Sequence, residues 1–197
     1  MVLILSYFTT NLFEWRQYTS LLVLMGICSL ISVAEGSEMK NTDNTNEMNG
    51  IPTTQEVGTG LKAEYFGNIN LSDLKKTTID KVVNFDWGTT VPNGLFNNVK
   101  YSARWTGKVM SKVSGVITFT TVSDDGVRLW VDGKLIIDDW NVHAPTPNSG
   151  NLKLDAGTKY DIKLEYFQKA GGAMVSLSWS APNLTKEIVP TKQLFPK

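Results

Sequence analysis

Two acidic residues, Asp124 and Asp125, stand side by side just before Gly126. Adjacent carboxylates repel each other, so a pair at one loop suggests that a positive group brings them together. A hard cation such as Ca²⁺ fits this role because it takes roughly six to eight oxygen ligands. The alternative is an ordinary Asp-Gly turn in which Asp125 caps backbone amides. The two residues alone leave both interpretations open.

A β-hairpin predicted immediately downstream would hold this acidic pair in place. Apolar and polar side chains alternate along residues 127–131, the pattern of a half-buried strand. Asp132-Gly133 predicts a two-residue turn, because both residues tolerate positive φ, and residues 135–137 supply the returning strand. Asp124 and Asp125 are therefore expected at the mouth of this hairpin.

The rest of the chain after residue 60 has the pattern of an all-β domain. Alternating apolar runs separated by Gly, Pro and Asn predict strands, and no run there has a helical period. The expected strands cover residues 61–66, 82–87, 102–110, 115–122, 127–137 as the hairpin, 151–154, 160–167 and 174–180. This number of short strands predicts an antiparallel β-sandwich or barrel.

Composition supports one folded domain and argues against a nucleic-acid partner. The chain has 197 residues, of which 42% are hydrophobic and 10% aromatic, enough for one core. Lys and Arg number 19, as do Asp and Glu, so no basic excess exists to collect phosphates.

The first 59 residues differ from the rest. Residues 1–34 contain an uncharged, largely apolar run after Arg16 that ends on Ser32-Val33-Ala34, which predicts a secretory signal peptide or, alternatively, an uncleaved membrane anchor. Residues 35–59 are polar and lack aromatic residues, which predicts a flexible linker before a domain at 60–197. A secreted or cell-surface location follows, with membrane contact only through the N-terminal segment. Cys28 is the only cysteine, so the domain has no disulfide.

Three motifs in one order carry a family resemblance. They are Trp105-Thr106-Gly107, the string from Ser123 to Trp140, and Leu177-Ser178-Trp179-Ser180. Together they resemble the PA14 domain, a β-sandwich module of bacterial toxins, glycosidases and fungal adhesins. The resemblance covers about residues 60–197 and implies an antiparallel β-sandwich of the PA14 type.

The resemblance also implies ligands for calcium and sugar. In sugar-binding PA14 domains the matching acidic pair is joined by a cis peptide bond and holds a Ca²⁺ ion that binds sugar hydroxyls. Carried onto this chain, it implies Asp124 and Asp125 as calcium ligands, with Gln168 contributing an amide oxygen from the loop at 168–173. That loop departs from the adhesins, which have an Asn ligand and a longer recognition segment, whereas here it is short and contains Lys169. A plain hairpin loop is the alternative.

Aromatic and polar residues near the pair complete the candidate site. Trp130 and Trp140 are the tryptophans expected to expose a face on which a sugar ring stacks, whereas Trp179 alternates with apolar residues and is expected in the core. Asp139 or Asn141 could line the same rim as Asp124. His143 is the only histidine, which excludes a metal centre built from several histidines.

The sequence therefore predicts a secreted or surface-tethered carbohydrate-binding module that is not an enzyme, depends on calcium and takes part in adhesion to a glycan or polysaccharide. Adjacent residues rarely place carboxylates about 5–9.5 Å apart on both sides of a glycosidic bond, and glycosidases of the family keep catalysis in a separate domain. The alternative from another class is a structural or protein-interaction domain with a protein partner and no sugar.

Overall fold

The computed structural model describes residues 56–96 and 99–197. The predicted signal peptide, anchor or signal-like helix (1–34) and most of the predicted linker (35–59) lie outside this part of the chain. The described residues form twelve strands and two short 3₁₀ helices. Their bounds are β1 Leu61–Phe66, β2 Leu74–Asp80, β3 Asn84–Gly88, η1 Pro92–Gly94, β4 Tyr101–Met110, β5 Gly115–Asp124, β6 Val127–Val131, β7 Lys134–Asp139, β8 Thr146–Leu154, β9 Lys159–Gln168, β10 Ala173–Ala181, β11 Leu184–Ile188, η2 Thr191–Gln193 and β12 Leu194–Pro196.

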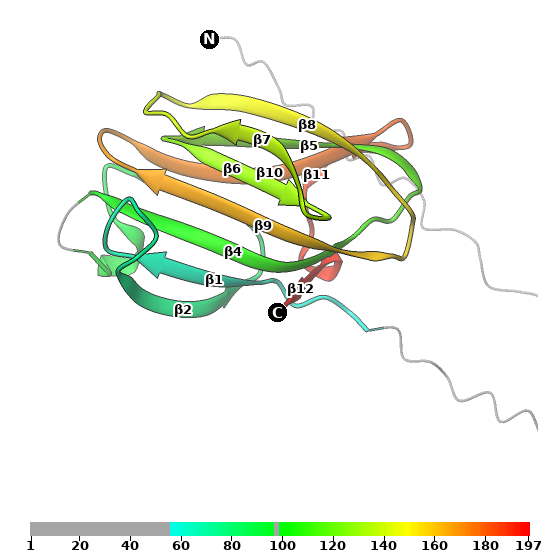
Figure 1. Ribbon diagram of the computed structural model, residues 1–197, viewed down its shortest axis with the longest axis horizontal. Helices are drawn as coiled ribbons and strands as arrows, with labels where there is room; N and C mark the ends of the chain where they lie inside the picture. Colours follow the sequence, from blue (N-terminus) through cyan, green and yellow to red (C-terminus); the bar gives the residue numbers. More distant parts are fainter. Residues whose placement is uncertain (1–55, 97–98) are drawn as a thin grey trace, which may run out of the picture. The chain divides into compact units, whose positions relative to one another are not determined.

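The strands form two sheets that pack face to face (Figure 1). The seven-stranded sheet has the order β2-β1-β4-β9-β6-β7, with β12 beside β4, and the five-stranded sheet has the order β11-β10-β5-β8, with β3 beside β10. All strand pairs are antiparallel. The predicted all-β antiparallel sandwich is confirmed, and within residues 56–96 and 99–197 no helix is long and apolar enough to cross a bilayer.

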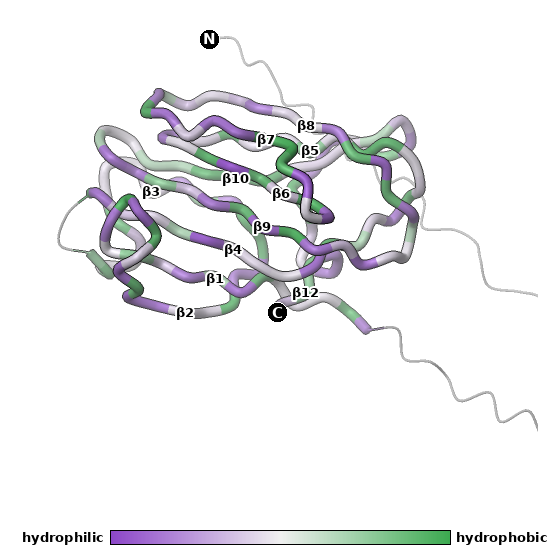
Figure 2. The backbone as a smooth tube through the Cα atoms, viewed as in Figure 1, coloured by the Kyte–Doolittle hydropathy of each residue, from purple (hydrophilic) through white to green (hydrophobic). Residues whose placement is uncertain are grey.

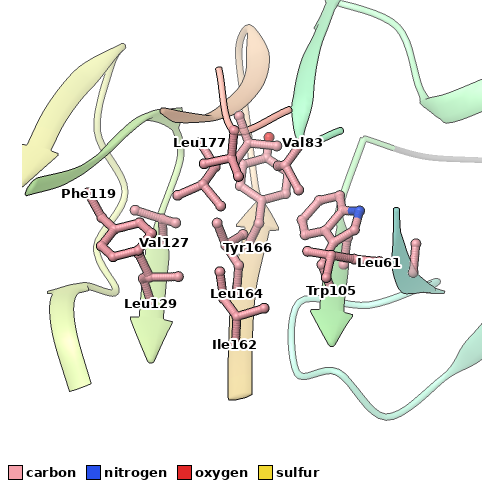
Figure 3. Packing of buried hydrophobic residues seen from close by; sticks show 14 of the residues in the cluster. Leu61, Val83, Trp105, Phe119, Val127, Leu129, Ile162, Leu164, Tyr166 and Leu177 are labelled. Carbon is pink, nitrogen blue, oxygen red and sulfur yellow. The ribbon is translucent and has the colours of Figure 1, made fainter. Parts of the chain in front are cut away.

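One hydrophobic core fills the space between the sheets. Val127, Leu129 and Leu164 reach it from the seven-stranded sheet, and Phe119 and Leu177 reach it from the five-stranded sheet (Figure 3). Hydrophobic and hydrophilic positions alternate along β9, as expected for a strand with one face in a core (Figure 2). Trp179 is fully buried, as its alternation predicted.

Three connections meet at one end of the sandwich and create the candidate site. β5 ends at Asp124, β7 ends at Asp139 and β9 ends at Gln168. Strand register brings these ends together, because Val127 pairs with both Asp139 and Tyr166. The β9–β10 connection lies at the left edge of Figure 1. At the other end of β6, the predicted two-residue turn is confirmed, with Asp132 at φ 53° and Gly133 at φ 72°.

Candidate functional site

Asp125 holds two loops together through its carboxylate. Oδ1 accepts a hydrogen bond from the backbone N–H of His143 at 3.1 Å, in the connection after β7. Oδ2 accepts from the backbone N–H groups of Lys169 at 2.8 Å and Ala170 at 3.3 Å, in the connection after β9. Only 1% of Asp125 is exposed. The carboxylate thus fixes the positions of both loops around the acidic pair.

Asp124 differs from Asp125 in its surroundings, although the two are joined by a cis peptide bond. Tyr166 Oη donates a hydrogen bond to the backbone carbonyl of Asp124 at 2.6 Å. No residue within 56–96 and 99–197 donates a hydrogen bond to its carboxylate, and only 8% of the residue is exposed. Burial, and next the charge of Asp125, raise the pKa of the Asp124 carboxyl, while His143 lowers it to a smaller extent. Asp124 is therefore an acidic group whose carboxylate has no hydrogen-bond donor in the described chain.

The loop that follows β9 closes over Asp124. A Cβ placed on Gly172 would lie 3.3 Å from Asp124 Oδ2, so the absence of a side chain there lets the loop backbone approach the carboxylate. Gln168 is fully buried at the start of this loop, where its Oε1 lies 3.2 Å from Tyr166 Oη and its Nε2 donates to the carbonyl of Gly171 at 3.5 Å. Gln168 thus supports the loop, and its amide oxygen already has a polar neighbour.

Trp140 lies at this end of the sandwich and lines a hollow. Its ring packs edge-on against Phe167, with centroids 4.7 Å apart, and the Arg128 guanidinium lies 4.0 Å from its ring centre. The hollow has a volume of about 340 Å³, and Asn70, Asn141 and Lys169 also line it. Asn141 thus reaches the same rim as Trp140, next to the loops held by Asp125.

Trp130 lies away from this rim. It belongs to the other half of β6, on the outer face of the seven-stranded sheet, opposite Lys163 of β9. Trp130 lines a separate and larger hollow. Neither the acidic pair nor any residue of the Gln168 loop lines that hollow. The structure therefore brings together Asp124, Asp125, Gln168 and the Trp140 rim. Trp130 lies outside this rim, and the Arg128 guanidinium is near both tryptophans, 5.4 Å from the ring centre of Trp130 and 4.0 Å from that of Trp140.

Asp139 organises the connection after β7. Its carboxylate accepts hydrogen bonds from Asn141 Nδ2 at 3.1 Å and Asn148 Nδ2 at 2.9 Å, and His143 Nε2 lies 3.3 Å from it. Burial raises the pKa of the Asp139 carboxyl, but the two hydrogen bonds and His143 outweigh burial, so the pKa is lower than usual. Asp139 thus fixes the loop from which the His143 amide reaches Asp125.

We expect Asp139→Asn to lower the free energy of unfolding by about 1 kcal/mol at pH 7, because it removes one of the acceptor oxygens. Since the pKa of Asp139 is lower in the folded state, the stabilisation is complete above the unfolded-state pKa of about 3.9 and is lost as the pH falls through the folded-state value. Urea unfolding of the variant and wild type at pH 7 and pH 3 measures this. A difference that is as large at pH 3 as at pH 7 would contradict the electrostatic explanation.

The donor atoms of the acidic pair fit a hard cation in part. Asp124 offers a nearly buried carboxylate without a donor, beneath a glycine backbone, and oxygen is the ligand that Ca²⁺ prefers. Asp125 has used three of its roughly four lone-pair directions on backbone amides. No three His, Cys, Asp or Glu residues of the described chain group as a metal site. A cation here would therefore rest on Asp124, one direction of Asp125, and loop carbonyls or water.

Sequence reasoning gave backbone amides as partners of Asp125 only as the alternative to a cation, and it did not identify which amides these are. The N–H groups of His143, Lys169 and Ala170 hold Asp125, and no side-chain pattern marks them. Tyr166 lies in the strand expected at residues 160–167, and its hydroxyl donates a hydrogen bond to the Asp124 carbonyl, a role that the strand pattern does not indicate. A tyrosine at the inward end of a strand next to an acidic loop is the one signal that could have suggested this role.

Two anti-sigma factor proteins are similar to this chain. The anti-sigma-I factor RsgI3 of Acetivibrio thermocellus is 46% identical over 140 residues, which are 71% of this chain and 22% of that protein. A solved anti-sigma factor domain-containing protein is also 46% identical, with a TM-score of 0.70, over 71% of this chain and 48% of that chain. The chain thus spans less than half the length of these two relatives.

A second solved structure shows the fold at lower identity. It is a PA14 sugar-binding domain from an RTX adhesin, 17% identical, with a TM-score of 0.59 over 72% of this chain and all of that chain. The model of the PA14 domain family matches residues 58–193, most of the described chain. The resemblance found in the three sequence motifs is confirmed, and the chain belongs to the PA14 domain family.

Proposed function

We propose that this domain binds carbohydrate, without catalysis, at the acidic pair and the loops around it. The observation that supports this most is the asymmetry of the pair. Asp125 accepts three backbone hydrogen bonds that hold the loops, while the Asp124 carboxylate lies nearly buried between them without a donor. A group in this state is stabilised by a cation, and a cation with open coordination positions can bind hydroxyl groups.

Calcium is the cation proposed for this site. Asp124 and the remaining direction of Asp125 would hold it, together with loop carbonyls, and the ion would supply positions for sugar hydroxyls. The chain's own contribution is to orient the loops through Asp125 and Gln168 and to offer the Trp140 rim beside them. Asn141 and Lys169 on this rim carry donors for further hydroxyls of the same sugar.

A sensing role is proposed for the whole protein to which this domain belongs. The similarity to two anti-sigma factor proteins supports a regulatory setting, in which glycan binding outside the cell would be the signal. An adhesive role is the second setting, supported by the fold shared with a domain from an adhesin. Both settings use the same binding event, and both place the domain outside the cell or on its surface.

Glycan binding with and without a chelator tests the proposal. We expect the full chain to bind members of a glycan array in Ca²⁺ and to lose them in EDTA, and Asp124→Asn to weaken binding by about tenfold or more. Asp155→Asn is the matched control, because Asp155 is exposed in the connection between β8 and β9, at the opposite end of the sandwich. Binding that survives both EDTA and Asp124→Asn would remove the calcium site. An array without hits, together with capture of a protein partner, would favour the protein-interaction alternative.

A further inference from the structure

The outer face of the seven-stranded sheet carries ordered rows of charge. One row runs across five strands with alternating sign, because strand register places Glu64, Arg104, Glu165, Arg128 and Asp138 side by side. The next row reads Lys62, Thr106, Lys163, Trp130 and Leu135, and it contains no acidic residue. The second row is thus a strip of cationic and aromatic side chains across the sheet.

A hollow of about 650 Å³ lies over this second row. We call it the sheet-face groove. Lys62, Arg104, Lys163 and Lys197 line it, against only two acidic residues, Glu64 and Asp161, which leaves a net charge of +2. Arg128 and Glu165 beside it cancel each other. The groove therefore favours an anionic ligand.

The cations in and beside the groove outnumber the carboxylates there, although each has an acidic neighbour, as Lys62 has in Glu64 at 2.9 Å and Lys197 has in Asp161 at 3.0 Å. Glu165 alone is shared by three of them, with contacts of 3.0 Å to Arg104 Nε, 2.7 Å to Arg128 Nη2 and 3.7 Å to Lys163 Nζ. Its carboxylate is nearly buried, whereas Lys163 and Arg104 are partly exposed. An additional carboxylate above Lys163 and Arg104 would supply the missing negative charge.

Trp130 adds an apolar surface to the same place. Lys163 Nζ lies 3.7 Å from the centre of its ring, so a cation and an aromatic ring stand together in the groove. A uronic acid has the matching parts, since its sugar ring has an apolar C–H face and its carboxylate is a planar acceptor for Lys or Arg. Hydroxyls on either side would meet Thr106 and Glu64.

We propose that the sheet-face groove is a second binding site, which takes an acidic polysaccharide chain that bears uronic acids. The site is distinct from the acidic pair. Lys163 and Gln168 lie on the same strand, five residues apart, which is about 16 Å at 3.3 Å per residue. Binding at the groove uses Lys163 and Arg104 directly and needs no calcium.

Oligogalacturonate is the probe, titrated into the full chain in EDTA so that the acidic pair cannot act through calcium. We expect binding that weakens as salt rises, because exposed charges carry it. A neutral xylo-oligosaccharide should bind more weakly in EDTA. The Lys62→Gln, Lys163→Gln double variant should weaken oligogalacturonate binding by about tenfold, and Lys186→Gln, which changes an exposed lysine of β11 in the other sheet, should not.

Further variants separate this site from the proposed calcium site. Trp130→Ala should also weaken binding of the acidic probe, and Asp124→Asn should leave it unchanged. Failure of oligogalacturonate to bind in EDTA, or equal binding by the double lysine variant and wild type, would overturn the proposal. A loss of the acidic probe on Asp124→Asn would do the same, because it would assign that ligand to the acidic pair. If Trp130→Ala does not fold, the double lysine variant still tests whether the groove binds the acidic probe.

Discussion

The Asp125→Asn variant should be less stable than the wild-type protein by about 3 kcal/mol in urea unfolding. The wild-type carboxylate accepts hydrogen bonds from three backbone amides, and both of its oxygens take part. An asparagine amide group turns one of these acceptors into a donor, which then faces an N–H group in a site that is 1% exposed. At least one amide loses its partner, and the charge that strengthens the remaining bonds is gone.

Asp124→Asn is the matched control, and its expected result has the opposite sign. The Asp124 carboxylate accepts no hydrogen bond from the described residues, and burial and the charge of Asp125 both disfavour its ionised form. In EDTA this variant should therefore be as stable as wild type or slightly more stable. The same substitution at two neighbouring aspartates would thus change the free energy of unfolding differently, because the Asp125 carboxylate accepts hydrogen bonds and the Asp124 carboxylate does not.

Equal destabilisation by the two substitutions in EDTA would contradict this division of roles. It would mean that the Asp124 carboxylate stabilises the fold in the absence of a bound ion. A second measurement sharpens the contrast. Added Ca²⁺ should raise the stability of the wild type, through binding to the folded state, and should leave Asp124→Asn unchanged.

Alternation was enough to predict the strands that form the core. Leu164 and Tyr166 point inward from β9, and Leu177 and Trp179 point inward from β10, as their spacing predicts. These strands have one face in water and one in the core, so their sequences carry a period of two. The same reasoning placed Arg128 and Trp130 on the outer face, where the structure has them.

Edge strands escaped prediction for a physical reason. β2 has only two large apolar residues, Leu74 and Ile79, and both are exposed, with 52% and 46% of their surface accessible. Its place at the edge of the sheet rests on backbone hydrogen bonds to β1, which any sequence can make. β8 is longer than predicted for a similar reason, since its first residues are polar and pair with β5 through the backbone.

The site was predictable in its acidic residues but not in their different tasks. Sequence placed Asp124 and Asp125 together at a strand end, and the end of β5 is where they lie. Which of them holds the loops depends on the amides of His143 and Lys169, which come from connections 18 and 44 residues away. Only the strand register brings these connections together. Trp130 shows the converse, because its outward position was predictable and its distance from the pair was not.

Glu165 is the second residue whose substitution should have a large effect. Its carboxylate is 5% exposed and lies between Arg104 and Arg128, with one oxygen bonded to each. Glu165→Gln removes the negative charge and one of the two acceptors, and it leaves two cations close together at a nearly buried position. Breaking a buried ion pair from one side costs about 3 kcal/mol, and for a domain of this size we expect the melting temperature to fall by about 9 °C.

Asp161 provides the control on the same strand and the same face. It has two cationic partners, Lys108 at 3.2 Å and Lys197 at 3.0 Å, but its side chain is 55% exposed. Exposed ion pairs contribute about 0.5 kcal/mol or less, so Asp161→Asn should shift the melting temperature by about 2 °C at most. Glu165 has one cationic neighbour more than Asp161, Lys163 at 3.7 Å, but the large difference between the two positions is burial. If both variants shift the melting temperature equally in calorimetry, burial is not what makes Glu165 important, and the charged row across the sheet contributes to stability only as a set of surface pairs.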